Sequence, residues 1–139
     1  MVKDVSPGPA WSFPLSLTDL DGTLFFAAIG THGSELWSSD GTRAGTVMVK
    51  DINPGRDWSL SWTPELAPVG GALYFAADDG THGEELWKTD GTEAGTVLVK
   101  DLYRGTKGSS PTWITDSGGA AFFSATNPST GRELWKSGG

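Results

Sequence analysis

Three glutamates stand at the same place in a repeated tripeptide, Glu-Leu-Trp: Glu35, Glu85 and Glu133, separated by 50 and 48 residues. Carboxylates repeated around a symmetric fold could line a common channel and act there as the acid and base of a hydrolase. The alternative, which we favour, is a structural role in which each carboxylate accepts a backbone hydrogen bond or pairs with a nearby lysine or arginine. These residues are therefore candidates for chemistry only if a channel brings them together.

The only two histidines, His32 and His82, lie in equivalent turns of the repeated sequence. An active site normally occurs once in a chain, so this repetition favours a role in the turns. The chain has no cysteine, which excludes disulfides, thiol catalysis and thiolate metal sites. It also lacks the GxSxG, GxGxxG, phosphate-loop and HExxH motifs. We therefore expect no enzymatic activity, no metal and no cofactor.

A second repeated triplet, Asp-Gly-Thr, follows each of the first two Glu-Leu-Trp motifs. Aspartate can accept backbone N–H hydrogen bonds in a tight turn, glycine can adopt a positive φ, and threonine can bond across the turn. A calcium site would need about six to eight oxygen ligands and more than one carboxylate, whereas each triplet offers a single carboxylate. The triplets are therefore predicted to be structural turns, formed by Asp40, Gly41 and Thr42 and by Asp90, Gly91 and Thr92.

The seven tryptophans fall into two groups. Three belong to the Glu-Leu-Trp motifs and are predicted to pack in the core. The other four lie in segments that differ between the repeats: Trp11, Trp58, Trp62 and Trp113. Variable loops on a rigid scaffold are common binding positions, and exposed indole rings suit stacking on sugars. We favour packing between repeats or between chains, and the alternative is a lectin-like surface that contacts a glycan.

Charge and composition narrow the class of partner. The formal net charge is −7, and an acidic surface repels a polyanion, so we expect no nucleic-acid partner. No stretch approaches the roughly 18 apolar residues of a membrane-spanning helix, and the N-terminal sequence does not have the pattern of a signal peptide. The 20 glycines and 8 prolines disfavour long helices and favour short strands with tight turns.

Three copies of one unit fill the 139 residues. Val-Lys-Asp occurs at 2–4, 49–51 and 99–101, and its spacing of 47 and 50 residues agrees closely with that of Glu-Leu-Trp. We expect one domain with repeats at about residues 1–47, 48–97 and 98–139.

Each unit is predicted to form four short antiparallel strands. The first strand precedes an Asp-Gly or Gly-Gly hairpin turn, and an aromatic run forms the second. The third strand carries Glu-Leu-Trp, and the fourth carries the valines that precede Lys-Asp. Such a unit describes a β-propeller blade, but a β-trefoil also uses three repeats of this length. Both folds are all-β, and the choice between them stays open at this point.

The third copy lacks its fourth strand, whereas Met1–Val5 has the sequence of one. Three blades cannot close a ring, so in a propeller residues 1–5 of one chain would complete the last blade of a neighbouring chain. The contact would use Val2, Lys3 and Asp4 of one chain against Leu134 and Trp135 of the other. We prefer a homodimer with six blades, and a homotrimer with nine remains open. A trefoil would instead be a monomer whose N-terminal strand pairs with its own third repeat.

The segment "ELWKTDGTEAGTVLVKD" resembles the ELWxxDGT repeat family, which occurs in tandem in large bacterial surface and secreted proteins. The resemblance is strongest over Gly30–Asp51 and Gly80–Asp101, and the third copy, "GRELWKSGG", lacks the Asp-Gly-Thr triplet. It implies β-propeller-like blades, an extracellular or cell-surface location, and no general enzymatic activity. Because family members carry many more repeats, the chain resembles a fragment or an engineered minimal unit. The expected function is that of a self-assembling scaffold or binding module.

Overall fold

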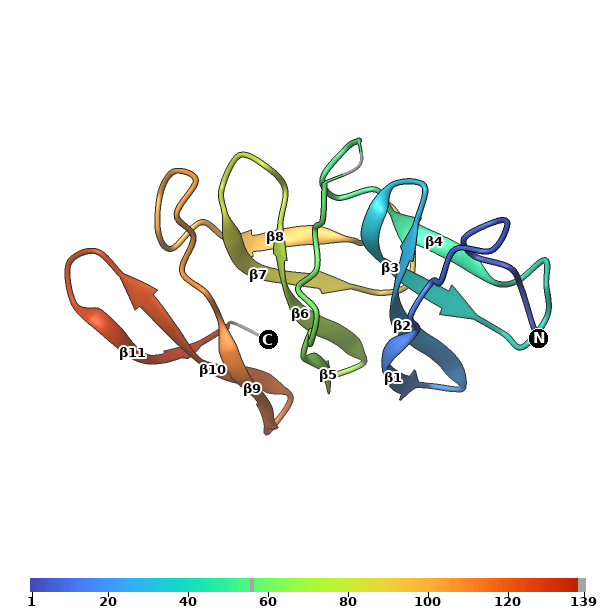
Figure 1. Ribbon diagram of the computed structural model, residues 1–139. Helices are drawn as coiled ribbons and strands as arrows, with labels where there is room; N and C mark the ends of the chain where they lie inside the picture. Colours follow the sequence, from blue (N-terminus) through green and yellow to red (C-terminus); the bar gives the residue numbers. More distant parts are fainter. Residues whose placement is uncertain (56, 138–139) are drawn as a thin grey trace.

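The computed structural model describes residues 1–55 and 57–137. These residues form eleven strands and no helix, arranged as two four-stranded antiparallel sheets and one three-stranded antiparallel sheet (Figure 1). The prediction of an all-β chain is therefore confirmed. No described segment is a helix long and apolar enough to cross a membrane.

The strands follow one another in chain order within the first two sheets. The first sheet contains β1 (Leu15–Leu20), β2 (Thr23–Gly30), β3 (Gly33–Ser39) and β4 (Val47–Lys50). The second sheet contains β5 (Leu66–Val69), β6 (Ala72–Asp78), β7 (Glu84–Thr89) and β8 (Val97–Lys100). The third sheet contains β9 (Thr112–Ser117), β10 (Ala120–Asn127) and β11 (Gly131–Lys136). Within the described residues, no segment pairs with the outer edge of β11, and Met1–Val5 forms no strand.

The first hairpin of each sheet turns at the dipeptide that the sequence singled out. Both central residues of each turn have positive φ, as a two-residue hairpin of type I′ requires. The φ values are 50° and 83° for Asp21 and Gly22, 56° and 81° for Gly70 and Gly71, and 63° and 78° for Gly118 and Gly119. The local twist of such a turn matches that of the strands it joins, so these dipeptides fix the register of β1–β2, β5–β6 and β9–β10.

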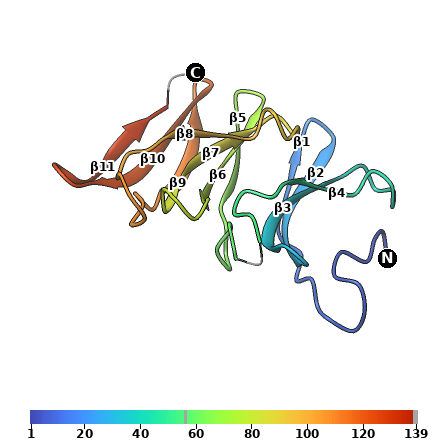
Figure 2. The same ribbon diagram turned by 90° about the horizontal axis from the view of Figure 1, so that it is seen from above.

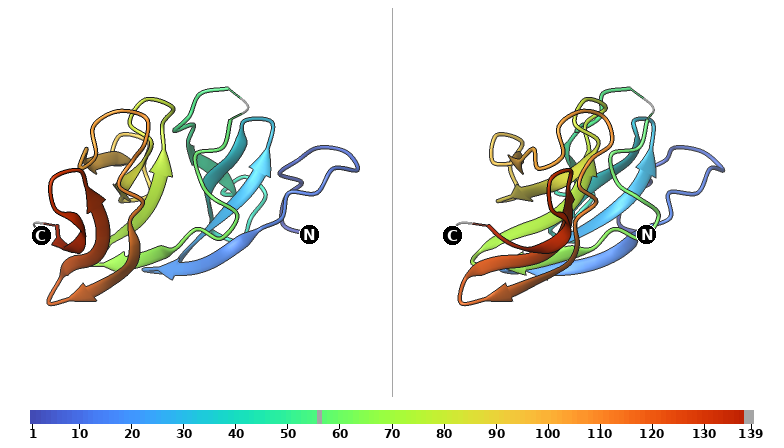
Figure 3. Two further views of the ribbon diagram at one scale, coloured as in Figure 1. Left: turned by 60° about the vertical axis from the view of Figure 1, so that its left-hand side comes forward. Right: turned by 90° about the vertical axis from the view of Figure 1, so that its left-hand side faces the viewer.

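The sheets lie side by side in chain order, with the N-terminal segment at one end of the row and β11 at the other (Figures 1 and 2). The first strands lie close together, because β1 contacts β5 and β5 contacts β9. Figure 3 shows the same row from two further directions.

Side chains alternate along each strand, so every sheet has two faces. We call the face toward the following sheet the forward face and the opposite one the rear face. The forward face of the first sheet packs on the rear face of the second through a buried cluster that includes Phe25, Leu36, Val49, Leu73, Phe75 and Trp87. The forward face of the second packs in the same way on the rear face of the third, through Tyr74, Leu86, Ile114, Ala121 and Phe123. One type of interface therefore occurs twice within the chain.

Candidate functional site

The Asp-Gly-Thr triplets that follow Glu-Leu-Trp at 40–42 and 90–92 form the same turn. Asp40 Oδ1 accepts hydrogen bonds from the N–H of Thr42 at 2.8 Å and from its hydroxyl at 2.7 Å, and Asp90 makes the equivalent pair with Thr92 at 2.9 and 2.7 Å. These hydrogen bonds, first those from the threonine hydroxyl, hold the pKa of each aspartate below its usual value. Each carboxylate therefore accepts its hydrogen bonds from its own turn.

Behind each turn lies a pair of buried hydroxyls. Thr89 and Thr96 contact each other at 2.7 Å, and the hydroxyl of Thr96 donates to the carbonyl of Thr92 at 2.6 Å. The first repeat has the same arrangement with Ser39 and Thr46. The turn is therefore tied to the end of the strand that follows it.

Two of the three repeated glutamates are buried against the segments that connect adjacent sheets. Glu35 Oε2 accepts a hydrogen bond from the hydroxyl of Ser59 at 2.5 Å, and Glu85 Oε2 accepts one from Ser109 at 2.5 Å. Backbone N–H groups of the same connecting segments also donate to these carboxylates, from Ile52 at 3.3 Å and from Tyr103 at 2.9 Å. Each glutamate therefore binds its own sheet to the segment that leads into the next sheet.

This burial corrects the idea that the glutamates line a channel. Glu35 is 1% exposed and Glu85 is fully buried, so neither faces a common opening. Burial raises the pKa of Glu35 to about 7, although the hydrogen bonds from Ser59 and Ile52 oppose the rise. The partners are also serine hydroxyls and backbone N–H groups rather than lysine or arginine. Glu133, in contrast, is exposed on β11.

The two histidines make different contacts in their equivalent turns. His82 Nδ1 lies 2.7 Å from Asp79 Oδ2, and His32 Nδ1 lies 3.1 Å from Asp51 Oδ2. The hydrogen bond to Asp79 raises the pKa of His82. Burial would raise the pKa of Asp79, but the hydrogen bonds from His82 and Thr81 lower it overall. Among the described residues, no group of three or more His, Asp or Glu side chains is placed to hold a metal ion.

Three of the four tryptophans from the variable segments gather on one surface. Trp11 contacts Phe13 edge-on with ring centroids 5.4 Å apart, Phe13 contacts Trp62 at 5.7 Å, and Trp62 contacts Trp58 at 5.0 Å. We call these four residues the aromatic patch. All of them are exposed, from 39% for Trp58 to 74% for Trp11. Trp113, on β9, is 78% exposed and makes no ring contact with the patch.

The N-terminal segment lies beside the first sheet in the way that β4 lies beside the second. The ammonium group of Lys3 donates to the carbonyl of Thr46 at 2.6 Å, and that of Lys50 donates to Thr96 at 2.9 Å. Lys3 also lies 5.9 Å from the ring centroid of Trp37, and Lys50 lies 6.0 Å from that of Trp87. Lys3 therefore occupies the position that a lysine from a preceding sheet would occupy.

The rear face of the first sheet is open where the other rear faces are covered. Leu17 is 61% exposed, whereas its equivalents on the second and third sheets, Leu66 and Ile114, are buried. A groove of about 730 Å³ runs between this face and the N-terminal segment, and its wall includes Val2 and Phe26.

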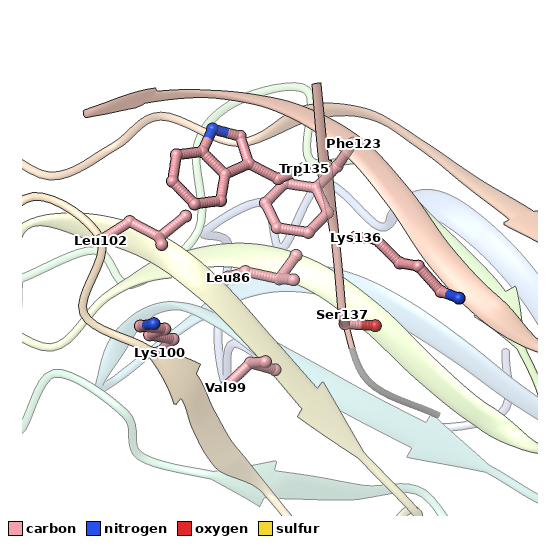
Figure 4. A pocket seen from close by; sticks show the side chains of 8 residues that line it. All are labelled: Leu86, Val99, Lys100, Leu102, Phe123, Trp135, Lys136 and Ser137. Atoms are coloured by element: carbon pink, nitrogen blue, oxygen red, sulfur yellow. The ribbon is translucent and has the colours of Figure 1, made fainter. Parts of the chain in front are cut away.

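The opposite end of the row has an open face and an open edge. Leu134 on β11 is 74% exposed, whereas Leu36 and Leu86 at the same place in the repeat are buried. A cavity of about 330 Å³ lies beside Trp135, between the second and third sheets (Figure 4). Figure 4 shows Trp135 and Phe123 on one side of it and Leu86, Leu102 and Val99 on the other.

The serines that bind the buried carboxylates were not predicted from the sequence. Ser12, Ser59 and Ser109 are separated by 47 and 50 residues, the same spacing as Val-Lys-Asp, so the repeat contained a signal for them. A single serine in a loop whose sequence differs between repeats is not recognisable as a functional residue. Its role follows only from its contact with glutamate in the folded chain. Phe13 was also missed, although it joins the tryptophans of the aromatic patch.

Comparisons with known proteins give no further assignment: no family model, no curated protein and no solved structure matches this chain.

Proposed function

We propose that the chain is a non-enzymatic scaffold of β-propeller blades that assembles head to tail with further copies of itself. In this assembly, the forward face of the third sheet of one copy packs on the rear face of the first sheet of the next. Residues 1–5 of that next copy add to the free edge of β11 as a fourth strand. The observation that carries the proposal is the position of Lys3, which repeats the contacts of Lys50.

The internal sheets define the register of the added strand. Leu36 pairs with Lys50 and Leu86 with Lys100, while Trp37 pairs with Met48 and Trp87 with Leu98. Transferred to the third sheet, this register pairs Leu134 with Lys3 and Trp135 with Met1. Addition of a strand to an exposed sheet edge is a common mode of protein recognition. It would also satisfy the free N–H and C=O groups along β11.

The same register supplies a side chain for the cavity in Figure 4. Leu98, the equivalent of Met1, packs against the core between the first and second sheets. Met1 would accordingly reach the cavity beside Trp135, between the second and third sheets. In the single chain Met1 is fully exposed. An unbranched methionine adapts well to an irregular gap of this kind.

The open face of the first sheet and that of the third sheet are both apolar. The rear face of the first sheet presents Leu17, and the forward face of the third presents Leu134 beside the half-buried Phe122. Equivalent faces meet at both internal interfaces. A head-to-tail contact closes into a ring when the rotation per copy divides a full turn. Two copies would give six blades and three would give nine, and we favour six because it lies in the common size range.

The position of the N-terminal segment favours this arrangement over a trefoil. A monomeric trefoil would pair residues 1–5 with the third repeat of the same chain. Lys3 instead lies against Trp37 and Thr46 of the first sheet, at the other end of the row from β11 (Figure 1). The resemblance to ELWxxDGT repeats is consistent with a scaffold of β-propeller blades.

The solution mass tests the proposal. Light scattering or native mass spectrometry of the 139-residue chain should give two or three times the mass of one copy, over a range of concentrations. A series of ever larger oligomers would retain the head-to-tail contact but contradict ring closure. The mass of a single copy at every concentration would overturn the proposal.

The aromatic patch supports a second candidate function, binding of a carbohydrate. It joins Trp11 and Phe13, which precede β1, with Trp58 and Trp62, which lie on the loop between the first and second sheets. Flat exposed indole rings suit the apolar faces of sugar rings. Titration with oligosaccharides should change the tryptophan fluorescence of the wild-type chain, and Trp62→Ala should weaken the binding. Trp113→Ala, which removes an indole outside the patch, is the matched control, and an unchanged affinity of the Trp62 variant would exclude this candidate.

A further inference from the structure

A buried contact between glutamate and serine occurs wherever one sheet leads into the next. Glu35 meets Ser59, and Glu85 meets Ser109, at the same distance of 2.5 Å. In both cases the glutamate belongs to the third strand of a sheet, and the serine belongs to the segment that leads into the following sheet. All four side chains are at most 3% exposed. The contact is therefore a regular part of the interface between sheets.

Ser12 is the third serine of this series, and its carbonyl makes the same backbone hydrogen bond as those of the other two. Its carbonyl accepts a hydrogen bond from the N–H of Ile29 at 2.7 Å, as that of Ser59 does from Asp78 at 2.9 Å and that of Ser109 from Thr126 at 2.8 Å. In each of the two pairs, the carboxylate comes from the preceding sheet. Ser12 precedes the first sheet, so no preceding sheet among the described residues could supply a glutamate to the Ser12 hydroxyl.

Glu133 is the third glutamate of the series. It occupies the place of Glu35 and Glu85, but it is exposed, and no hydrogen bond to its side chain is present within residues 1–55 and 57–137. Glu133 at one end of the row and Ser12 at the other are thus the two halves of one contact.

We infer that Glu133 of one copy accepts a hydrogen bond from the Ser12 hydroxyl of the next copy, which makes this pair the residue contact that sets the register of assembly. The inference rests on the proposed head-to-tail assembly. Docking would bury Glu133, and a buried carboxylate without donors is costly. Ser12, together with the backbone N–H of Val5 or Ser6, which are equivalent to Ile52 and Tyr103, supplies the donors. A copy docked one residue out of register would leave Glu133 unpaired, so the contact selects the correct register.

Association of single variants tests the contact. Ser12→Ala and Glu133→Gln should each weaken assembly by roughly tenfold to a hundredfold, the range expected for a hydrogen bond to a charged group, and the double variant should be little worse than either. Both residues lie at the open ends of the single chain, so its thermal unfolding should change little. The matched control is Ser109→Ala, which removes the same contact within one chain and should lower thermal stability far more than association.

Mixing the two variants gives a test that a purely local role would fail. In a ring of two copies, a Glu133→Gln chain paired with a Ser12→Ala chain has one interface with both changes and one that is intact. Each variant alone has two impaired interfaces. Native mass spectrometry of an equal mixture should therefore show mixed rings well above the statistical half.

The outcomes separate the two proposals. If the wild-type chain assembles but Ser12→Ala assembles equally well and mixes statistically, the inference about this contact is wrong while the assembly stands. If the wild-type chain is a monomer at every concentration, both are overturned.

Discussion

The Ser59 hydroxyl lies 2.5 Å from Glu35 Oε2 where the segment that leads into the second sheet packs on the first, and both side chains are almost completely shielded from solvent. Oε1 of the same carboxylate is buried without a hydrogen-bond partner among the described residues. An interior of this kind favours the neutral form of an acid, which explains why the pKa of Glu35 lies near 7. The pair therefore links the packing of two sheets to the protonation of one residue.

The first prediction concerns the pH dependence of stability. Glu35 has a raised pKa in the folded chain and an ordinary value near 4.5 when unfolded, so between pH 4.5 and about 7 the folded state binds more protons. Stability should therefore fall as pH rises through this window, by on the order of 2 kcal/mol from Glu35. Denaturant unfolding at several pH values measures the slope.

Two variants assign that slope to Glu35. Glu35→Gln should flatten it, although burial also raises the pKa of Glu84, so some slope should remain. Ser59→Ala removes a hydrogen bond that lowers the pKa of Glu35 and should extend the fall to higher pH. An identical slope in the wild-type chain and Glu35→Gln would show that Glu35 does not titrate in this range.

The second prediction concerns the Asp-Gly-Thr turn. A Cβ atom on Gly45 would overlap the carboxylate of Asp40 and push it away from Thr42. Gly45→Ala should therefore destabilise the fold by about 1–3 kcal/mol, as other overpacked positions do. In an Asp40→Ala background the added methyl group has no carboxylate to displace, so the same change should cost much less. Thermal unfolding of the wild-type chain, the two single variants and the double variant measures this coupling, and additive effects would argue against the contact.

The third prediction concerns the open face of the third sheet. Leu134→Lys places a charge where the proposed interface needs an apolar side chain, so association should be lost or weakened by at least about a hundredfold. Trp62→Lys, which also replaces an exposed apolar residue but lies in the aromatic patch, should assemble normally. Sedimentation of both variants gives the comparison. Equal assembly of the two would place the interface elsewhere.

The fourth prediction concerns the added strand. Successive backbone N–H groups of a strand point in opposite directions, so a change of both Val2 and Lys3 to proline removes a ladder donor whichever way the strand faces. The Val2→Ala, Lys3→Ala variant loses the same side chains but keeps both N–H groups. We expect the proline variant to assemble markedly less than the alanine variant, measured by native mass spectrometry. Indistinguishable assembly would mean that residues 1–5 do not pair with β11.

Much of the fold could be predicted because it depends on neighbours in the chain. The Asp-Gly and Gly-Gly dipeptides adopt positive φ at both positions, and the aromatic runs beside them form the buried strands β2, β6 and β10. Each of these sequence patterns occurs three times, once in every repeat, which strengthened the prediction. Among the described residues, β11 forms a free edge of the third sheet.

The contacts of the candidate site could not be predicted from neighbouring residues in the sequence. Glu35 and Ser59 are 24 residues apart in the chain. The type of residue and its place in a strand do not distinguish a buried structural glutamate from one that lines a channel. Only the tertiary packing of the connecting segment on β3 buries the carboxylate and brings the serine to it. The gathering of Trp11, Phe13, Trp58 and Trp62 likewise joins loops that enter different sheets.

The sequence by itself therefore determined the strands, their turns and the threefold repetition, since these follow from side-chain alternation and from the backbone freedom of glycine. Only the tertiary structure decided which carboxylates are buried and which are exposed. Burial of each glutamate depends on whether a segment distant in the chain packs against it, and no local pattern of residues encodes that.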